Sequence, residues 1–506
     1  MVTAVTPPPL ILFGLEAADF HLIQRWAEEG HLPNIATLME HGCWGKLGGP
    51  DMVSEHGVWV SLYSGLSRHQ HGYYYWRPLK PGTYDLDLAD FRALGMLPFW
   101  AGLRGRPKKV AIIDPPEGYP LQGLSGVQLA NWAPHNARYP TCSLPADLFG
   151  KLRNRFGPPM YVEEMVRSTP RADMTIHRGL LKQIEQKGAI CRHLIGTDRF
   201  DLIVTTFFES HVAGHQFLKY LAEDSPPGTG LANAIRDVYQ AIDEQLGHIM
   251  AVVPEASNIF VLSNVGLHEE YPSRNLLEAF CLELGYQVAA RSRATGFNAL
   301  TWARGKMPRS WRFALRDRLP KRMLQRLNTG EYRAGTDWSR TRVFPIPSLY
   351  TGFLRVNLRG REPGGIVDPG QEYAELLDRV EEDLALLVDP RSNLPAVKKV
   401  TRTVDLFGGD PPIWLPDLFV VWVPTTYLVE KVVHPKAVLL QKNLDFTRGS
   451  HHTHRGFVAA AGPGIRRRNH LGDLEVLDLA PTFQTLLGEP ILERMTGRAI
   501  ESMLVR

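Results

Sequence analysis

Short apolar runs recur along the chain, and each one ends in polar residues. Such runs are typical of buried strands, and we expect strands at Leu10–Leu15, Lys109–Ile113, Leu202–Phe208, Asn258–Ser263, Leu418–Trp422 and Phe457–Ala461. Amphipathic segments lie between them and predict helices, namely Phe20–His41, Ala232–Val253 and Tyr373–Leu387. Strands that alternate with helices indicate an α/β fold with a mainly parallel sheet between two helical layers.

The run Leu202–Phe208 leads into the stretch with the most distinctive chemistry. It is followed by Glu209, Ser210 and His211, and His215 comes four residues after His211. If the chain is helical here, both imidazoles lie on one face of the helix, which is the spacing that lets two side chains bind one metal ion. The alternative is that both histidines are ordinary polar residues of a loop and a helix start.

Two further turns carry candidate residues. Glu16 follows the first strand, where the ligand crevice of an open α/β sheet forms; it could equally cap the next helix. Ser54 precedes an apolar helical segment, Val58–Ser64. A hydroxyl near a helix N-terminus is a candidate nucleophile, and it is also a common helix cap.

Three histidines, His451, His452 and His454, stand directly before the strand FVAAA. Metal ligands usually come from several loops at one edge of a sheet. We therefore expect one of the three to complete a site with His211 and His215.

Composition narrows the class of protein. The 506 residues are 44% hydrophobic and 22% charged, which suits one large α/β domain with insertions or two domains. The formal charge of +4 gives no reason to expect nucleic-acid binding. No signal peptide or membrane-spanning run is recognisable, and the four cysteines (Cys43, Cys142, Cys191 and Cys281) lack metal-binding spacing, so we expect a cytoplasmic protein. The basic segment Arg304–Arg342 is either a lid for an anionic substrate or a solvated helical face.

Motifs spread over nearly the whole chain resemble the alkaline phosphatase superfamily, and within it the type I phosphodiesterase/nucleotide pyrophosphatase-like proteins. They are FGLEAADFHLI, LPNIATLMEHG, WVSLYSG with the later His71-Gly72, KKVAIIDPPEGYPL, ESHVAGHQF, YQAIDEQLGHIM, TDWSRTRVF, VNLRGREPGG, PDLFVVW, HRGFVAAAGPGI and LDLAPTFQTLLGEP. The resemblance implies a single doubly wound α/β domain over residues 1–506, with cap insertions at about 73–200 and 267–345.

The resemblance also implies a divalent metal site, with Zn as the usual ion and one or two ions bound. It places His211, His215 and His452 at the first site, with His211 where the family has Asp, and Glu16 at the second site, again where Asp is usual. The family's SDHG aligns with Ser263, Asn264, Val265 and Gly266. Asn264 could offer an oxygen but Val265 could not bind a metal, so His268 or His56 would have to replace the missing imidazole.

The resemblance leaves two adjacent residues, Ser54 and Glu55, as candidates for the position of the nucleophile. Counting back from WVSLYSG puts Glu55 at the family's hydroxyl position and Ser54 one residue earlier. We expect Ser54 to be the nucleophile, with Arg77, Lys80 or the basic segment supplying the positive charge that a missing second metal would leave out.

The sequence therefore predicts a metal-dependent hydrolase of phosphate esters, above all of phosphodiesters, acting on a small anionic substrate. The alternative is a member of the superfamily that has lost this hydrolysis, and that acts as a metal-dependent enzyme of different chemistry or as a binding protein. The altered second metal site favours the alternative, and the number of metal ions bound would discriminate between the two.

Overall fold

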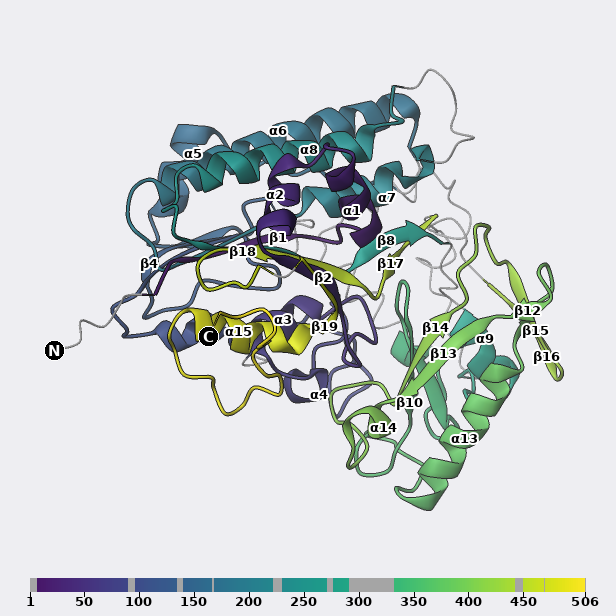
Figure 1. Ribbon diagram of the computed structural model, residues 1–506. Coiled ribbons are helices and arrows are strands. Elements are labelled where there is room, and N and C mark those ends of the chain that lie inside the picture. The colour runs from purple at the N-terminus through teal and green to yellow at the C-terminus, as the bar shows by residue number, and fades with distance from the viewer. Residues whose placement is uncertain are drawn as a thin grey trace.

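The computed structural model describes residues 7–89, 96–133, 140–165, 168–221, 230–270, 276–290, 332–441, 449–467 and 469–505. Its centre is a nine-stranded sheet in the order β19-β2-β18-β7-β1-β6-β3-β4-β5 (Figure 1). Strands β7, β1, β6, β3 and β4 run parallel to one another, whereas β18 is antiparallel to both of its neighbours. The predicted α/β fold with a mainly parallel sheet is thus confirmed.

Five strands of this sheet, β1, β3, β6, β7 and β18, match predicted apolar runs to within one residue at each end, whereas β2, β4, β5 and β19 were not predicted. The nine strands are β1 (Leu10–Leu15), β2 (Cys43–Gly48), β3 (Lys109–Ile113), β4 (Ser125–Ala130), β5 (Cys142–Leu144), β6 (Leu202–Phe207), β7 (Asn258–Ser263), β18 (Gly456–Ala461) and β19 (Asn469–Glu475). A two-stranded ladder, β8 (Gly266–Glu269) with β17 (Ser450–Thr453), extends beyond β7 and β18.

Strand β1 is fully buried because helices cover both faces of the sheet. Ile11, Phe13 and Leu15 point into one hydrophobic cluster, which contains residues of α1, α2, α6 and α8. Leu10 and Leu12 point into the other, with residues of α3 and α15. This alternation explains why the run is apolar at every position rather than at every second one.

The helices of this part of the chain are α1 (Phe20–Glu28), α2 (Pro33–His41), α3 (Val58–Ser64), α4 (Arg68–His71), α5 (Leu148–Phe156), α6 (Pro170–Ile195), α7 (Glu209–Phe217), α8 (Ala234–Met250) and α15 (Leu479–Leu486), with short 3-10 turns η1 (Phe99–Leu103), η2 (Leu218–Tyr220) and η5 (Val476–Asp478). The segment Phe20–His41, expected as one helix, is two, because Gly30 adopts a positive φ of 80° and Pro33 begins a new helix.

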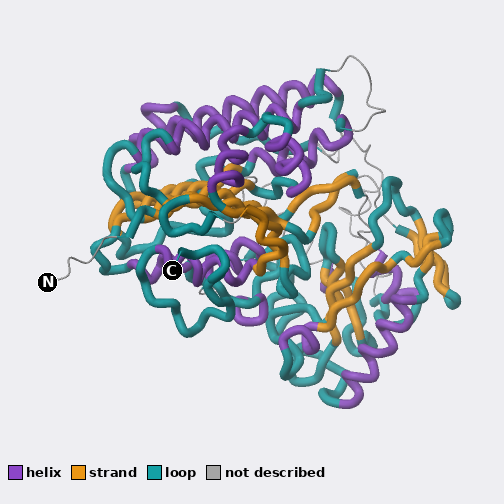
Figure 2. Tube along the Cα trace, viewed as in Figure 1, coloured by secondary structure: helices purple, strands orange, loops and turns teal. Residues whose placement is uncertain are grey.

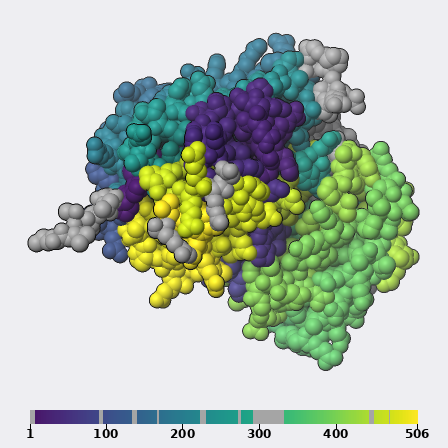
Figure 3. Space-filling view, in the orientation of Figure 1, coloured from purple at the N-terminus to yellow at the C-terminus, as the bar shows by residue number. Residues whose placement is uncertain are grey.

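A second lobe, green in Figures 1 and 3, lies beside the central sheet. It holds two antiparallel four-stranded sheets, visible as separate strand groups in Figure 2. Their elements are α9 (Leu276–Glu283), β9 (Val343–Ile346), β10 (Gly352–Val356), α13 (Gln371–Ala385), β11 (Val388–Asp389), β12 (Leu394–Pro395), β13 (Val397–Arg402), α14 (Thr403–Phe407), β14 (Leu418–Trp422), β15 (Lys431–His434) and β16 (Ala437–Leu440).

The lobe begins within the expected insertion at 267–345 and continues to residue 441. The other expected insertion, 73–200, instead supplies β3, β4 and β5 to the central sheet. A hydrophobic cluster joins the two lobes, in which Tyr74 and Tyr75 of the main lobe pack with Phe353 and Phe419 of the second.

Within the described residues, no helix combines the length and the apolar character needed to span a bilayer. The cytoplasmic location and the absence of nucleic-acid binding stay predictions.

Helix α2 has a long-range cap. Leu32 precedes it and offers no side-chain acceptor. The Asp243 carboxylate on α8 instead accepts hydrogen bonds from the backbone N–H groups of Asn34, at 3.1 Å, and of Ile35, at 2.9 Å. Because unsatisfied N–H groups at a buried helix start are costly, this contact ties α2 to α8.

We expect Asp243→Ala to lower the free energy of unfolding by about 1–3 kcal/mol, because two backbone N–H groups at the helix start lose their acceptor. Urea unfolding measures this. The matched control is Glu244→Ala, at an exposed position on the same helix, which should change stability by less than about 0.5 kcal/mol. Equal stability of the two variants would show that α2 does not depend on this cap.

Candidate functional site

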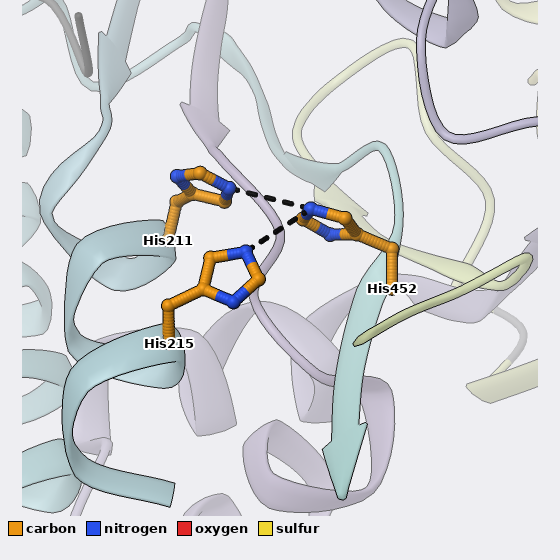
Figure 4. A group of neighbouring side chains, drawn as sticks. All are labelled: His211, His215 and His452. Atoms are coloured by element: carbon orange, nitrogen blue, oxygen red, sulfur yellow. Dashed lines mark hydrogen bonds between the residues drawn. The ribbon is translucent and has the colours of Figure 1, made fainter. Parts of the chain in front are cut away.

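Three imidazoles converge where β6 passes into α7. His211 and His215 lie on α7, and His452 lies on β17 (Figure 4). The Nε2 atom of His452 is 3.3 Å from Nε2 of His211 and 3.2 Å from Nε2 of His215. One ligand atom from each residue lies within 4.8 Å of the others, so the three could hold a metal ion.

Local structure accounts for this convergence. One residue, Phe208, separates β6 from α7, and the spacing of four residues puts His211 and His215 on the same face of the helix, with ring centroids 4.6 Å apart. His452 arrives from the ladder with β8, in which it pairs with Leu267. The Ser450 hydroxyl lies 2.7 Å from Nδ1 of His215, which fixes the ring with Nε2 directed at His452.

An aromatic residue of the second lobe packs on two of the three histidines. The Tyr350 ring is parallel to that of His215, at 6.0 Å between centroids, and perpendicular to that of His452, at 5.4 Å. It also stacks on His451 at 4.4 Å. His451 therefore contacts Tyr350, whereas His452 contacts the two histidines of α7.

The Glu16 carboxylate, which the resemblance places at a second metal site, is already occupied by hydrogen bonds within the protein. The carboxylate accepts from Nε1 of Trp59 and, at 3.0 Å, from Nδ2 of Asn264. The other end of the Asn264 amide accepts from the backbone N–H of Ala17 at 2.9 Å. Both ends of this amide are thus engaged by the protein. Burial raises the pKa of Glu16 to about 7, although both hydrogen bonds act in the opposite direction.

Ser54 is buried inside the turn before α3. Its side chain is 0% exposed, and its hydroxyl donates to the carbonyl of Tyr74 at 3.2 Å. The Arg68 guanidinium donates to this hydroxyl at 2.8 Å and to the Ser54 carbonyl at 3.2 Å. The Ser54 hydroxyl therefore stabilises this turn through its hydrogen bonds with Tyr74 and Arg68.

Two more carboxyls lie beside this turn. Thr351 donates to Glu55 at 3.1 Å. Burial raises the pKa of Glu55 to about 7 and that of Glu117 to about 8; a hydrogen bond from Tyr73 opposes the shift of Glu117, and the charge of Glu16 adds to it. These carboxyls therefore carry less negative charge at neutral pH than exposed carboxyls would.

The remaining predicted residues lie elsewhere around the site. His268 bonds to Glu270, with 2.6 Å between Nε2 and Oε2, and His56 lies 3.7 Å from Glu55. Val265 is buried in the hydrophobic cluster beneath the sheet. Arg77 packs over the neighbouring Trp76 ring. Most of the basic segment Arg304–Arg342, namely 304–331, lies outside the described residues.

Four residues of the site were not found by sequence reasoning. Trp59 and Glu117 stand within motifs that we quoted, but nothing in those motifs marks an indole or a carboxyl as a partner of Glu16. Tyr350 and Thr351 belong to the second lobe, and Thr351 is separated from Glu55 by 296 positions. No local pattern could have paired residues so distant.

Comparison with known proteins gives one family. Residues 10–324 match the sequence model of the family described as type I phosphodiesterase/nucleotide pyrophosphatase. No curated protein sequence matches the chain.

Among solved structures, human ectonucleotide pyrophosphatase/phosphodiesterase 5 is 11% identical, covers 96% of each chain and gives a TM-score of 0.48. The murine protein is 11% identical, with 98% of this chain and 100% of that chain covered and a TM-score of 0.49. An inactive variant of the murine protein in complex with AMP is 12% identical, with 96% of each chain covered and a TM-score of 0.49.

The buried carboxyl of Glu117 predicts a pH dependence of stability. Its pKa is raised from 4.5 to about 8, so between these values the folded protein keeps a proton that the unfolded chain has released. Stability is therefore lost as the pH rises through this window, by up to about 1.4 kcal/mol per pH unit. We expect Glu117→Gln to flatten this decline, measured as the urea midpoint over a series of pH values.

The control is Glu244→Gln, an exposed substitution, which should leave the decline unchanged. An equally steep decline in Glu117→Gln would mean that Glu117 is ionised in the folded protein.

Proposed function

The chain belongs to the type I phosphodiesterase/nucleotide pyrophosphatase family, and from that premise we propose that it is a metal-dependent hydrolase of phosphate esters, above all of phosphodiesters. The observation that carries the proposal is the convergence of His211, His215 and His452. Membership of a family of phosphoester hydrolases supports the reaction class.

The three imidazoles fit a divalent cation such as Zn. Metal–nitrogen bonds of about 2.0–2.1 Å in a tetrahedral site separate the ligand atoms by about 3.3–3.4 Å. The distances of 3.3 and 3.2 Å from His452 to the two histidines of α7 agree with this geometry. Three protein ligands also leave one position open, as in catalytic rather than structural sites. The cation would stabilise the negative charge that develops on the phosphoryl oxygens.

We expect one ion rather than two. The second position would rely on Glu16 and Asn264, but Trp59 and Asn264 already donate to the Glu16 carboxylate. A cation there would have to displace both donors, and the amide adds no charge to attract it. His268 is already paired with Glu270, which supports the same conclusion.

Positive charges near the site support an anionic substrate. After burial itself, the charges of Arg68, Lys398 and Lys399 contribute to the lowering of the His454 pKa to about 4. The two lysines lie exposed on β13 of the second lobe. These lysines would favour an anionic ligand on the side of the second lobe.

For the nucleophile, we propose water in place of the predicted Ser54. The Ser54 hydroxyl is fully buried and bonded to Arg68 and to the Tyr74 carbonyl. An attack by this oxygen would require the turn to open and the guanidinium to lose its partner, whereas water needs no such change. The alternative function, a family member without phosphoester hydrolysis, draws support from the closed second position, and metal content separates the two.

Changing His215 to Ala should weaken Zn binding by more than about 100-fold, because it removes a direct ligand, whereas the loss of an outer partner typically costs 10–100-fold. Elemental analysis after dialysis and calorimetric titration with Zn measure this. His248→Ala, at an exposed position on α8, is the matched control and should bind like the unmodified protein. Undiminished metal content in His215→Ala would remove the proposed centre.

Changing Ser54 to Ala should leave the turnover of bis(p-nitrophenyl) phosphate within about tenfold of the unmodified protein, because an indirect contact is lost. The variant should be less stable by about 1–3 kcal/mol, because Arg68 loses an acceptor. Turnover lost by a thousandfold or more, with metal content retained, would instead identify Ser54 as the nucleophile.

A further inference from the structure

Glu55 follows Ser54 in the turn before α3. Its side chain is 3% exposed. Oε2 accepts a hydrogen bond from the Thr351 hydroxyl at 3.1 Å, and Oε1 lies 3.7 Å from Nε2 of His56 without a hydrogen bond from any described residue. One oxygen is therefore oriented by the second lobe while the other keeps its accepting capacity.

The orienting residue also connects Glu55 with the three histidines. Thr351 follows Tyr350, whose ring packs on His215 and His452. The charge of Glu270 also acts on Glu55, and Glu270 directly follows β8, the strand that pairs with β17 and His452. The Glu55 carboxyl therefore contacts Thr351, and the histidines contact the preceding residue, Tyr350.

We propose that Glu55 is the general base of the hydrolysis, accepting a proton from the water that attacks phosphorus. This inference rests on the proposed function and adds a catalytic residue to it. As the water oxygen forms its bond to phosphorus, one proton passes to Oε1 of Glu55, and the bond from phosphorus to the leaving oxygen breaks with its electron pair. The leaving alkoxide or phenolate takes a proton from solvent, and Glu55 returns its own to solvent afterwards.

The environment of the carboxyl suits this task. Burial raises its pKa to about 7, whereas its own backbone N–H, the hydrogen bond from Thr351 and the charge of Arg68 lower it and the charge of Glu270 raises it. His56 is a further titratable neighbour, with Nε2 3.7 Å from Oε1. A base with a pKa near the working pH combines a populated basic form with a strong tendency to accept the proton. Hydrolysis should therefore increase as the pH rises through about 7.

The test compares Glu55→Gln with the unmodified protein on bis(p-nitrophenyl) phosphate. We expect kcat/KM to fall by about 10²–10⁴-fold, with Zn content unchanged, and the acid limb of its pH profile to disappear. Glu28→Gln, an exposed position on α1, is the control and should keep both rate and profile. Infrared difference spectra of the metal-free protein should lose one protonated-carboxyl band in Glu55→Gln.

Thr351 tests the orientation of the base without touching Glu55. Thr351→Val removes the hydroxyl at similar volume and should lower kcat by about tenfold with little change in KM, whereas Thr351→Ser should restore it. This pair keeps the inference falsifiable if Glu55→Gln folds poorly.

Several results would overturn the inference. They are an unchanged rate in Glu55→Gln, a lowered rate with the acid limb intact, or a hydroxylamine-trapped adduct on Glu55, which would make the carboxylate a nucleophile. Thr351→Val with wild-type kcat would also count against it. If the unmodified protein binds Zn but does not hydrolyse the diester, the proposed function fails, and this inference fails with it.

Discussion

The parallel pairing of β1 with β6 on one side and β7 on the other determines where the site can form. Leu15 faces both Phe207 and Ser263, so the three strands end level with one another. Whatever follows them emerges at the same edge: Glu16 after β1, α7 after β6 and Asn264 after β7. A shift of one residue in either pairing would turn every side chain to the opposite face and expose apolar residues of β1 to the wrong layer. Because the sheet is buried on both faces, the register of these strands is fixed, and so is the position of the site residues at the sheet edge.

Burial also determines the pKa values of the carboxyl groups at this edge of the sheet. The imidazole of His211 and the amide of Asn264 add no negative charge to this edge. The carboxyls Glu16, Glu55 and Glu117 have pKa values of about 7, 7 and 8, because the protein around them excludes water. A site with little fixed negative charge repels an anionic phosphodiester less than a site rich in carboxylates, and it also retains fewer cations.

The sequence predicted the central strands well, because a strand buried on both faces must be apolar throughout, as Leu10–Leu15 is. It could not assign Leu418–Trp422 to the second lobe, since that run is equally apolar in an antiparallel sheet covered by helices. The pair His211 and His215 was visible from its helical spacing, and the resemblance pointed to His452 as their partner; their role as metal ligands stays a prediction. The contact of Thr351 with Glu55 was out of reach, because it depends on how two lobes pack.

The Asn264 amide, bonded to Glu16 through one end and to the Ala17 N–H through the other, links the turn after β1 to the turn after β7. An Asn264→Asp change would delete the donor to Glu16 and bring two carboxylates together. The amide is thus a cross-link between two strand ends, and negative charge could be added at this position only by breaking its bond to Glu16.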